Sequence, residues 1–282
     1  MHARVDSDAR FRPNMRNTAS MAAHHHLQVE LVDHVATLTF QCPPQNYVSP
    51  ALVGDLADAL TSLDNDDACR VVVLASRGKN FCAGADFSTG VADARVTQAG
   101  SGSINPIALY RQAMRLFDTR KPLVVALQGA AIGAGAGLAL VADFRIAADD
   151  ARISFNFNRI GIHPGFGLSF TLPRVVGQQK AALLFYTGRR IVAQEAHQMG
   201  LVDDVVAAAD LLQAAQRLAA DIAVSSPVAV QSTRATLRAG LADQVRQANA
   251  RELSEQQLHF RSSDFEEGVR AMSERRPPVF GG

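Results

Sequence analysis

The sequence predicts an α/β protein, because short apolar strands alternate with helical patterns over the first two thirds of the chain and helices dominate from Leu211 onward. The 282 residues are enough for one large domain with an appendage and a substantial core. With 48% apolar residues and a formal charge of +1, the composition is that of an ordinary globular protein, and it gives no general attraction to nucleic acid.

The first 26 residues differ from the rest. Four arginines stand among small and polar residues without helical or strand periodicity, and Asp6 and Asp8 argue against a transit peptide. We expect a disordered leader over residues 1–26, with Met21 as a candidate translation start. The histidines at 24–26 are interpreted as a chance or tag-like run, so no metal site is predicted. Three scattered cysteines predict neither a disulfide framework nor a metal site, and they favour a reducing, cytoplasmic location.

Residues 27–75 contain the first predicted elements. The alternation over 27–40, interrupted by Asp33-His34, indicates a hairpin of two strands. Pro50 to Leu63 has helical spacing, with Ser49 as a candidate N-cap. Arg70 to Ala75 is typical of a buried strand.

The segment Lys121 to Asp143 (KPLVVALQGAAIGAGAGLALVAD) organises the chain. Its apolar run 123–127 predicts a buried strand, residues 133–137 predict a turn of small residues, and a helix is expected to resume at 138–141. Free N–H groups at the start of such a helix attract negative charge, including charge that develops in a transition state.

Three other interpretations compete for this segment. The uncharged stretch 122–142 is long enough to cross a bilayer, but its glycine density and Gln128-Gly129 argue against a span. The spacing does not cleanly match a dinucleotide-binding loop, and the glycines could instead serve close helix–strand packing.

A second strand and glycine turn, at residues 70–86, places small residues where their N–H groups could share one cleft with the first turn. Two such donors at one oxygen would form an oxyanion hole.

The remaining residues predict strands at 144–147, 153–157 and 201–206. They predict helices through Tyr110, at 168–176 and at 193–199, and further helices almost to the end of the chain. The predicted organisation is therefore a leader (1–26), a mixed core (27–210) and a helical region (211–282).

Four motifs together resemble the enoyl-CoA hydratase/isomerase (crotonase) superfamily. They are FCAGADF (81–87), QGAAIGAGAGLALVADFRIAA (128–148), TGRRIVAQEAHQMGLVDDVV (187–206) and SSDFEEGVRAMSERRPPVF (262–280), with Met272 where an aromatic residue is usual. The resemblance implies a crotonase (ClpP-like) spiral of ββα units, a C-terminal helical trimerisation region, and homotrimers or hexamers. It also implies a role in acyl-CoA or fatty acid metabolism, as a lyase or isomerase, with a coenzyme A thioester as substrate and no other cofactor.

The resemblance also implies particular site residues. The thioester oxygen would lie between the backbone N–H groups of Ala85 and Ala134, with the backbone around Phe81, Cys82 and Ala83 facing the adenine. The turn residues Gly84 and Gly133, and the neighbouring Gly137, Phe157 and Tyr110, are the other expected substrate contacts.

This sequence departs from the family pattern at the two glutamates that place and activate water. Read without gaps, those positions hold Gly137 and Phe157, and neither side chain can move a proton. Losing an acid or base typically costs 10²–10⁴ in rate, so standard two-glutamate hydration is disfavoured. Gly137 would leave room for a bound bicarbonate to act as base.

Several side chains are candidates for the missing proton transfer, each with a structural alternative. His163 is the tentative acid/base, although a histidine that holds the turn is favoured. Tyr110 could donate to an acyl group, but a structural tyrosine is favoured. Asp86 is interpreted mainly as a helix cap. Asn156 and Asn158 could hold a carbonyl or a water, and Arg275 and Arg276 could reach CoA phosphates or form a solvated tail.

Two functions follow from these residues. The first is an acyl-CoA enzyme that stabilises a thioester enolate or oxyanion without the glutamate pair, by isomerisation, hydrolysis, carbon–carbon cleavage or atypical hydration. The second is a non-catalytic acyl-CoA binding or carrier protein. No metal is expected in either.

Overall fold

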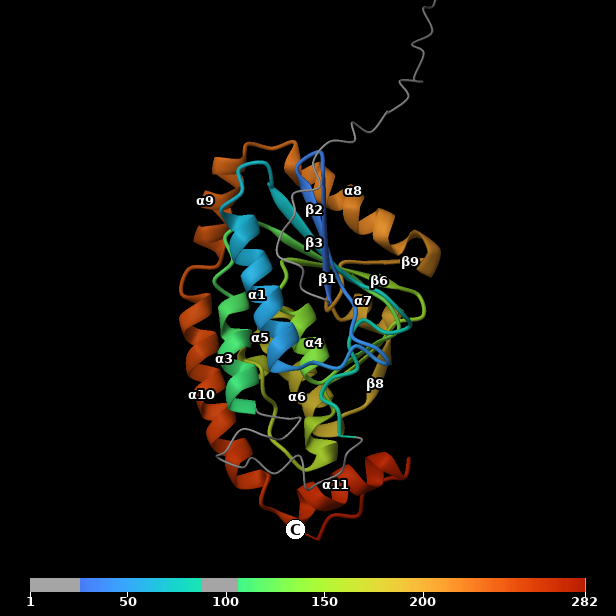
Figure 1. Cartoon of the computed structure of the whole chain (residues 1–282). Coiled ribbons are helices and arrows are strands. Elements are labelled where there is room, and N and C mark those ends of the chain that lie inside the picture. Colours follow the sequence, from blue (N-terminus) through green and yellow to red (C-terminus); the bar gives the residue numbers. More distant parts are fainter. Residues whose placement is uncertain (1–25, 88–105, 282) are drawn as a thin grey trace, which may run out of the picture.

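A six-stranded sheet forms the centre of the computed structural model, which describes residues 26–87 and 106–281 (Figure 1). Its strands, in spatial order, are β1 (Leu27–Val32), β2 (Val35–Phe40), β3 (Val71–Ser76), β4 (Leu123–Leu127), β6 (Phe144–Ala148) and β9 (Asp204–Val206). β1 and β2 are antiparallel, and every other neighbouring pair is parallel. The predicted leader lies outside the described residues.

The predicted hairpin at the edge of this sheet is confirmed. Asp33 and His34 have φ values of 46° and 69°, and the two-residue loop that they form joins β1 to β2. Positive φ at both central residues is the geometry that matches the twist of the strands.

Helices cover both faces of the sheet because its central strands are apolar on both sides. Alternate residues of β3 and β4, such as Val73 and Val124, contact α8 (Leu211–Ala223) on one face. Their neighbours belong to the main core on the other face. That core is covered by α1 (Pro50–Asp64), α3 (Pro106–Leu116), α5 (Leu168–Val176), α6 (Gln178–Thr187) and α10 (Leu241–His259). The helix predicted from Pro50 is confirmed, with Ser49 Oγ accepting from the N–H of Leu52 at 3.1 Å.

A second, three-stranded sheet consists of β5 (Ala130–Ile132), β7 (Arg152–Ser154) and β8 (Arg190–Val192). The sequence predicted neither β5 nor β8. The strand predicted over 153–157 was too long, because β7 ends at Ser154 and a 3₁₀ helix, η1 (Asn156–Ile160), follows. The helix predicted to resume at Leu138 was also placed wrongly, since α4 spans Ala134–Ala139. Close packing, described below, favours this early start despite the low helix propensity of glycine.

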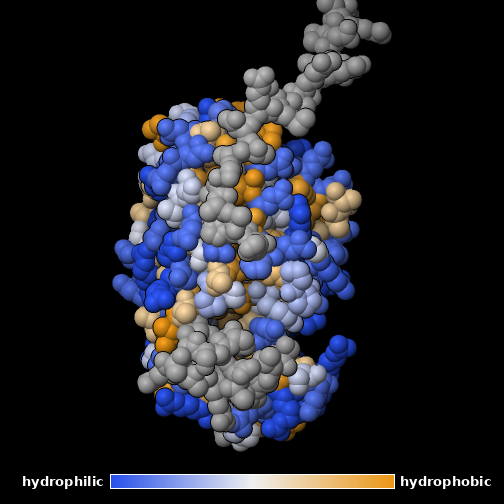
Figure 2. All heavy atoms as spheres, viewed as in Figure 1, coloured by the Kyte–Doolittle hydropathy of each residue, from blue (hydrophilic) through white to orange (hydrophobic). Residues whose placement is uncertain are grey.

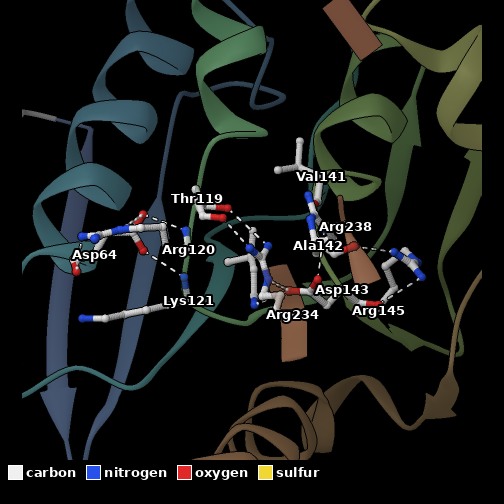
Figure 3. Close-up of polar contacts among 11 residues, drawn as sticks. Asp64, Thr119, Arg120, Lys121, Val141, Ala142, Asp143, Arg145, Arg234 and Arg238 are labelled. Carbon is white, nitrogen blue, oxygen red and sulfur yellow. Dashed lines mark hydrogen bonds and ion pairs between the residues drawn. The ribbon is translucent and has the colours of Figure 1, made fainter. Parts of the chain in front are cut away.

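The remaining short elements are α7 (Ala193–Gln198) and η2 (Ala208–Asp210), and the C-terminal region adds α9 (Pro227–Leu237) and α11 (Ser263–Ser273). Asp143 ties α9 to the sheet. Its carboxylate accepts from the N–H of Leu123 at 2.9 Å, from Arg234 at 2.8 Å and from Arg238 at 3.0 Å (Figure 3). One carboxylate therefore links the start of β4 to two arginines of the C-terminal region.

The face of the molecule in Figure 2 is mostly hydrophilic, with apolar side chains in small groups. Within residues 26–87 and 106–281, no helix has the length and apolar character needed to cross a membrane.

Candidate functional site

Two backbone segments meet beside the second sheet. Cys82 bridges to Ala131 in parallel, with Cys82 N–H donating to Ala130 O and Ile132 N–H donating to Cys82 O, both at 3.0 Å. A Cβ on Gly135 would lie 2.3 Å from the Cys82 carbonyl oxygen, so only glycine allows α4 to start this close. The bridge places residues 83–85 next to residues 132–134.

Gly84 and Gly133 shape the two turns. Gly84 has a φ of 87°, and a Cβ there would lie 2.7 Å from the carbonyl oxygen of Ile132. Gly133 has a φ of 53° and precedes α4, while its own N–H donates to Ser154 O at 2.8 Å. The N–H groups of Ala85 and Ala134 donate to no described residue.

A small, mainly apolar cavity of about 70 Å³ lies between these turns. Seven of the predicted site residues line it: Ala83, Gly84, Ala85, Tyr110, Gly133, Ala134 and Phe157. The other described walls are Phe87, Pro106, Leu109, Ile132, Asn156, Ile160, Ile162, Phe260 and Met272. The structure therefore places the two predicted turns at one cavity. The sequence analysis did not predict the walls formed by Phe260 and α11.

Four predicted site residues lie outside this cavity. Phe81 and Cys82 are fully buried in the core, and burial raises the pKa of the Cys82 thiol to about 12. Gly137 lies under Phe166, whose ring carbons would be 2.8 Å from a Cβ at that position. The predicted room for bicarbonate beside Gly137 is thus wrong, because an aromatic ring fills it.

The fourth predicted site residue outside the cavity is His163, the tentative acid/base. Its Nδ1 lies 2.7 Å from Pro164 O, and its backbone N–H donates to Nδ1 of His259 at 3.1 Å. These contacts hold the turn that precedes α5. The structure does not bring His163 to the described walls of the cavity.

Tyr110 is the titratable side chain on the described walls. Its hydroxyl donates to Gln256 Oε1 at 3.0 Å, and Gln256 Nε2 donates to His163 O at 2.8 Å. Burial, opposed by the Gln256 hydrogen bond, raises the pKa of Tyr110 above its ordinary value. Tyr110 therefore stays protonated near neutral pH, with its hydroxyl proton directed to Gln256.

Phe157 and Asn156 form the wall next to Gly133. The Phe157 ring is 3.7 Å from where a Gly133 Cβ would lie, and Asn156 Oδ1 is at the same distance from that point. The Asn156 side chain makes no hydrogen bond within the described part of the chain, so its amide can bind a ligand.

Asp86 does not line the cavity, and the helix that it was expected to cap falls outside the described residues. No group of three or more His, Cys, Asp or Glu side chains in residues 26–87 and 106–281 could hold a metal ion.

Comparison with known proteins agrees with this fold. Residues 30–282 match the enoyl-CoA hydratase/isomerase family. The 1,2-epoxyphenylacetyl-CoA isomerase of Escherichia coli is 32% identical over 253 residues, covering 88% of this chain and 95% of that protein. The crotonyl-CoA hydratase of Syntrophomonas wolfei is 32% identical over 263 residues, covering 92% of this chain and 98% of that protein.

A solved structure extends the agreement to three dimensions. The enoyl-CoA hydratase/isomerase of Pseudoalteromonas atlantica superposes with a TM-score of 0.79 at 30% identity, covering 91% of this chain and 100% of that one. Because an isomerase and a hydratase are equally similar in sequence, these identities do not choose between reactions. They do establish the fold and the kinship: the chain belongs to the enoyl-CoA hydratase/isomerase family.

Proposed function

We propose that this protein is an acyl-CoA enzyme that stabilises an oxyanion or enolate of the thioester with the backbone N–H groups of Ala85 and Ala134. The observation that carries the proposal is that both groups lack a partner among the described residues and that both residues line the same cavity. Preorganised donors in a water-poor site stabilise developing charge strongly, and losing one such donor typically costs 10²–10³ in kcat.

The proposed chemistry does not use a carboxylate pair. Phe157 occupies one expected glutamate position, and the other, Gly137, is covered by Phe166. The described walls contain one titratable group, Tyr110, whose hydroxyl donates to Gln256, and no carboxylate. Isomerisation, thioester hydrolysis, carbon–carbon cleavage and atypical hydration all remain compatible, because each passes through a charged thioester oxygen.

One observation favours a second candidate function, a non-catalytic acyl-CoA binding protein. The described walls contain no base, so the cavity could hold a thioester and leave it unchanged.

For either function we propose assembly into homotrimers or hexamers through residues 211–282, where Val224, Val228 and Leu237 are exposed apolar side chains. The cytoplasmic location stays a prediction.

Ala134→Pro tests the oxyanion proposal. Proline suits the first position of a helix, and the φ of 53° and ψ of −117° at Gly133 lie outside the helical region that a following proline disfavours. The variant therefore removes one N–H while α4 keeps its start. Ala134→Gly, which retains the N–H, is the matched control.

Binding and turnover would be followed together on a panel of enoyl-, 3-oxoacyl- and aryl-CoA thioesters. We expect turnover by the wild type and by Ala134→Gly, and a 10²–10³-fold lower kcat in Ala134→Pro. Equal kcat in both variants would reject the oxyanion role. Tight binding by the wild type with no turnover across the panel would establish the binding protein instead.

A further inference from the structure

A second, larger depression adjoins the cavity. This groove has a volume of about 850 Å³ and shares Asn156, Ile160 and Met272 with the cavity. Five arginines line it and no acidic residue does: its arginines are Arg159, Arg189, Arg190, Arg275 and Arg276. We refer to it as the arginine groove.

Two of these arginines are neutralised by neighbouring carboxylates. Arg189 makes two hydrogen bonds to Glu195, and Arg276 pairs with Glu267 and Glu274. The hydrogen bond from Arg276 lowers the pKa of the Glu267 carboxyl to about 2. These pairs fix the sides of the groove and contribute no free charge to it.

The other three arginines have no carboxylate partner within residues 26–87 and 106–281. Arg159 donates through Nε to the carbonyl oxygen of Thr187 at 2.7 Å. Arg190, on β8, and Arg275, after α11, are exposed, and neither side chain makes a hydrogen bond or ion pair with another described residue. The groove thus holds three positive charges that no described anion balances, which favours an anionic ligand.

Glycines bring the three elements around the groove close together. A Cβ on Gly188 would lie 2.6 Å from Arg159 Cγ, and one on Gly268 would lie 2.5 Å from the carbonyl carbon of Ile160. Arg275 itself has a φ of 56°, and the N–H of Arg276 donates back to Ala271 O at 3.0 Å, which turns the chain at the end of α11. The arrangement of η1, β8 and α11 around the groove is therefore set by backbone contacts and does not depend on the arginine side chains.

We propose that the arginine groove binds a carboxylate at the far end of the acyl group, so that the preferred ligands are monothioesters of dicarboxylic acids. This inference rests on the proposed function, in which the thioester lies on Ala85 and Ala134. The groove meets the cavity at Asn156, Ile160 and Met272, so an acyl group that leaves the cavity at this end would enter the groove. None of Phe81, Cys82 and Ala83, the residues expected to face adenine, lines it.

The arginines have the chemistry that this ligand needs. A guanidinium binds a carboxylate through two parallel hydrogen bonds, and the apolar cavity accommodates the methylene carbons between the two ends of the acyl group. Because Arg190 and Arg275 are exposed, each contributes modestly, on the order of a two- to fivefold change in affinity. Replacing both should cost about tenfold.

The test compares adipyl-CoA with hexanoyl-CoA, which share the acyl length and differ in the terminal carboxylate. Their dissociation constants would be measured by titration calorimetry for the wild type and for the double variant Arg190→Gln/Arg275→Gln. The control Arg217→Gln changes an exposed arginine of α8 that lies outside the groove and forms no ion pair with any described residue. The same two acyl groups would also be supplied as pantetheine thioesters, which lack the nucleotide and its phosphates.

We expect the wild type to bind adipyl-CoA about tenfold more tightly than hexanoyl-CoA, and this preference to be lost in the double variant but kept in the control. The preference should persist with the pantetheine thioesters and weaken as salt is raised. The absence of a preference in the wild type would overturn the inference. An equal loss for both CoA esters, with pantetheine thioesters unaffected, would assign the arginines to CoA phosphates instead. Either result leaves the Ala134→Pro test, and so the proposed function, standing.

Discussion

Glu252 is a buried carboxylate whose replacement should destabilise the protein more than any surface charge change. The side chain is 0% exposed, and each oxygen accepts a backbone N–H at 2.7 Å, from Gly167 and from Ser169. Asn249 Nδ2 also donates to Oε2, at 3.3 Å. These bonds hold the start of α5 directly after Phe166, a bulky residue with a φ of 68°.

Glu252→Gln keeps the shape and removes one acceptor. The remaining oxygen would take the Oε2 position, where two donors converge, and the new NH₂ group would face the N–H of Ser169. One charge-assisted hydrogen bond is lost, the other becomes neutral, and a donor is left unpaired, for a total of about 2–4 kcal/mol of unfolding free energy. At roughly 2–4 °C per kcal/mol for a domain of this size, the Tm should fall by about 5–15 °C.

The assay is thermal unfolding followed by circular dichroism, with Glu255→Gln as the matched control three residues along α10. Glu255 pairs with Arg251, whose side chain is 75% exposed, so its loss should cost no more than about 0.5 kcal/mol. If Glu252→Gln lowers the Tm no further than Glu255→Gln, the buried carboxylate does not hold α5, and the account of how Phe166 is held is wrong.

Two further predictions concern the buried side of the site. The pKa of Cys82 is raised from 9.0 to about 12, so the thiol's contribution to stability is complete below pH 9 and is lost as the pH rises toward 12. The unfolding free energy would be measured in urea at pH 9, 10 and 11. It should fall less steeply with pH in Cys82→Ala than in the wild type, by up to ~1.4 kcal/mol per pH unit, and equal slopes would contradict a raised pKa at Cys82. Gly137→Ala places a Cβ 2.8 Å from the Phe166 ring and should cost about 1–3 kcal/mol by overpacking, which Phe166→Leu in the same chain should partly restore; a wild-type Tm for Gly137→Ala alone would show that the slot is not filled.

Much of the large sheet could be predicted because its signals are local. The run 123–127 is apolar throughout and forms β4 with the predicted bounds, and Asp33-His34 is a turn between two alternating strands. The strands of the small sheet have three residues each, which is too short for a period to be recognised. The start of α4 is set by contact between Gly135 and Cys82, 53 positions apart in the sequence, so propensity placed the helix too late.

The candidate site divides in the same way. Its two turns were predicted because small residues at 83–85 and 133–134 allow a close approach of the backbone to a ligand or to another element, and the family resemblance pointed to the first use. The wall residues Phe260 and Met272 are ordinary apolar residues of C-terminal helices, and their sequence context carries no sign that they reach the cavity. For His163 the structural interpretation that the sequence favoured fits the contacts, since Nδ1 lies 2.7 Å from the carbonyl oxygen of Pro164, and the tentative acid/base role has no support from the cavity walls.

The two phenylalanines at this site favour one kind of chemistry over another. Phe157 lines the cavity beside Gly133, and Phe166 covers Gly137, so apolar rings stand at the two positions where the family resemblance would place glutamates. An apolar wall lowers the local dielectric, which strengthens the interaction of the Ala85 and Ala134 N–H groups with a charged oxygen. The same burial raises the pKa of Tyr110 and keeps it a donor. In the proposed function, the described walls stabilise negative charge on a thioester oxygen and supply no base. We therefore expect substrates whose reaction depends more on stabilising that charge than on removing a proton.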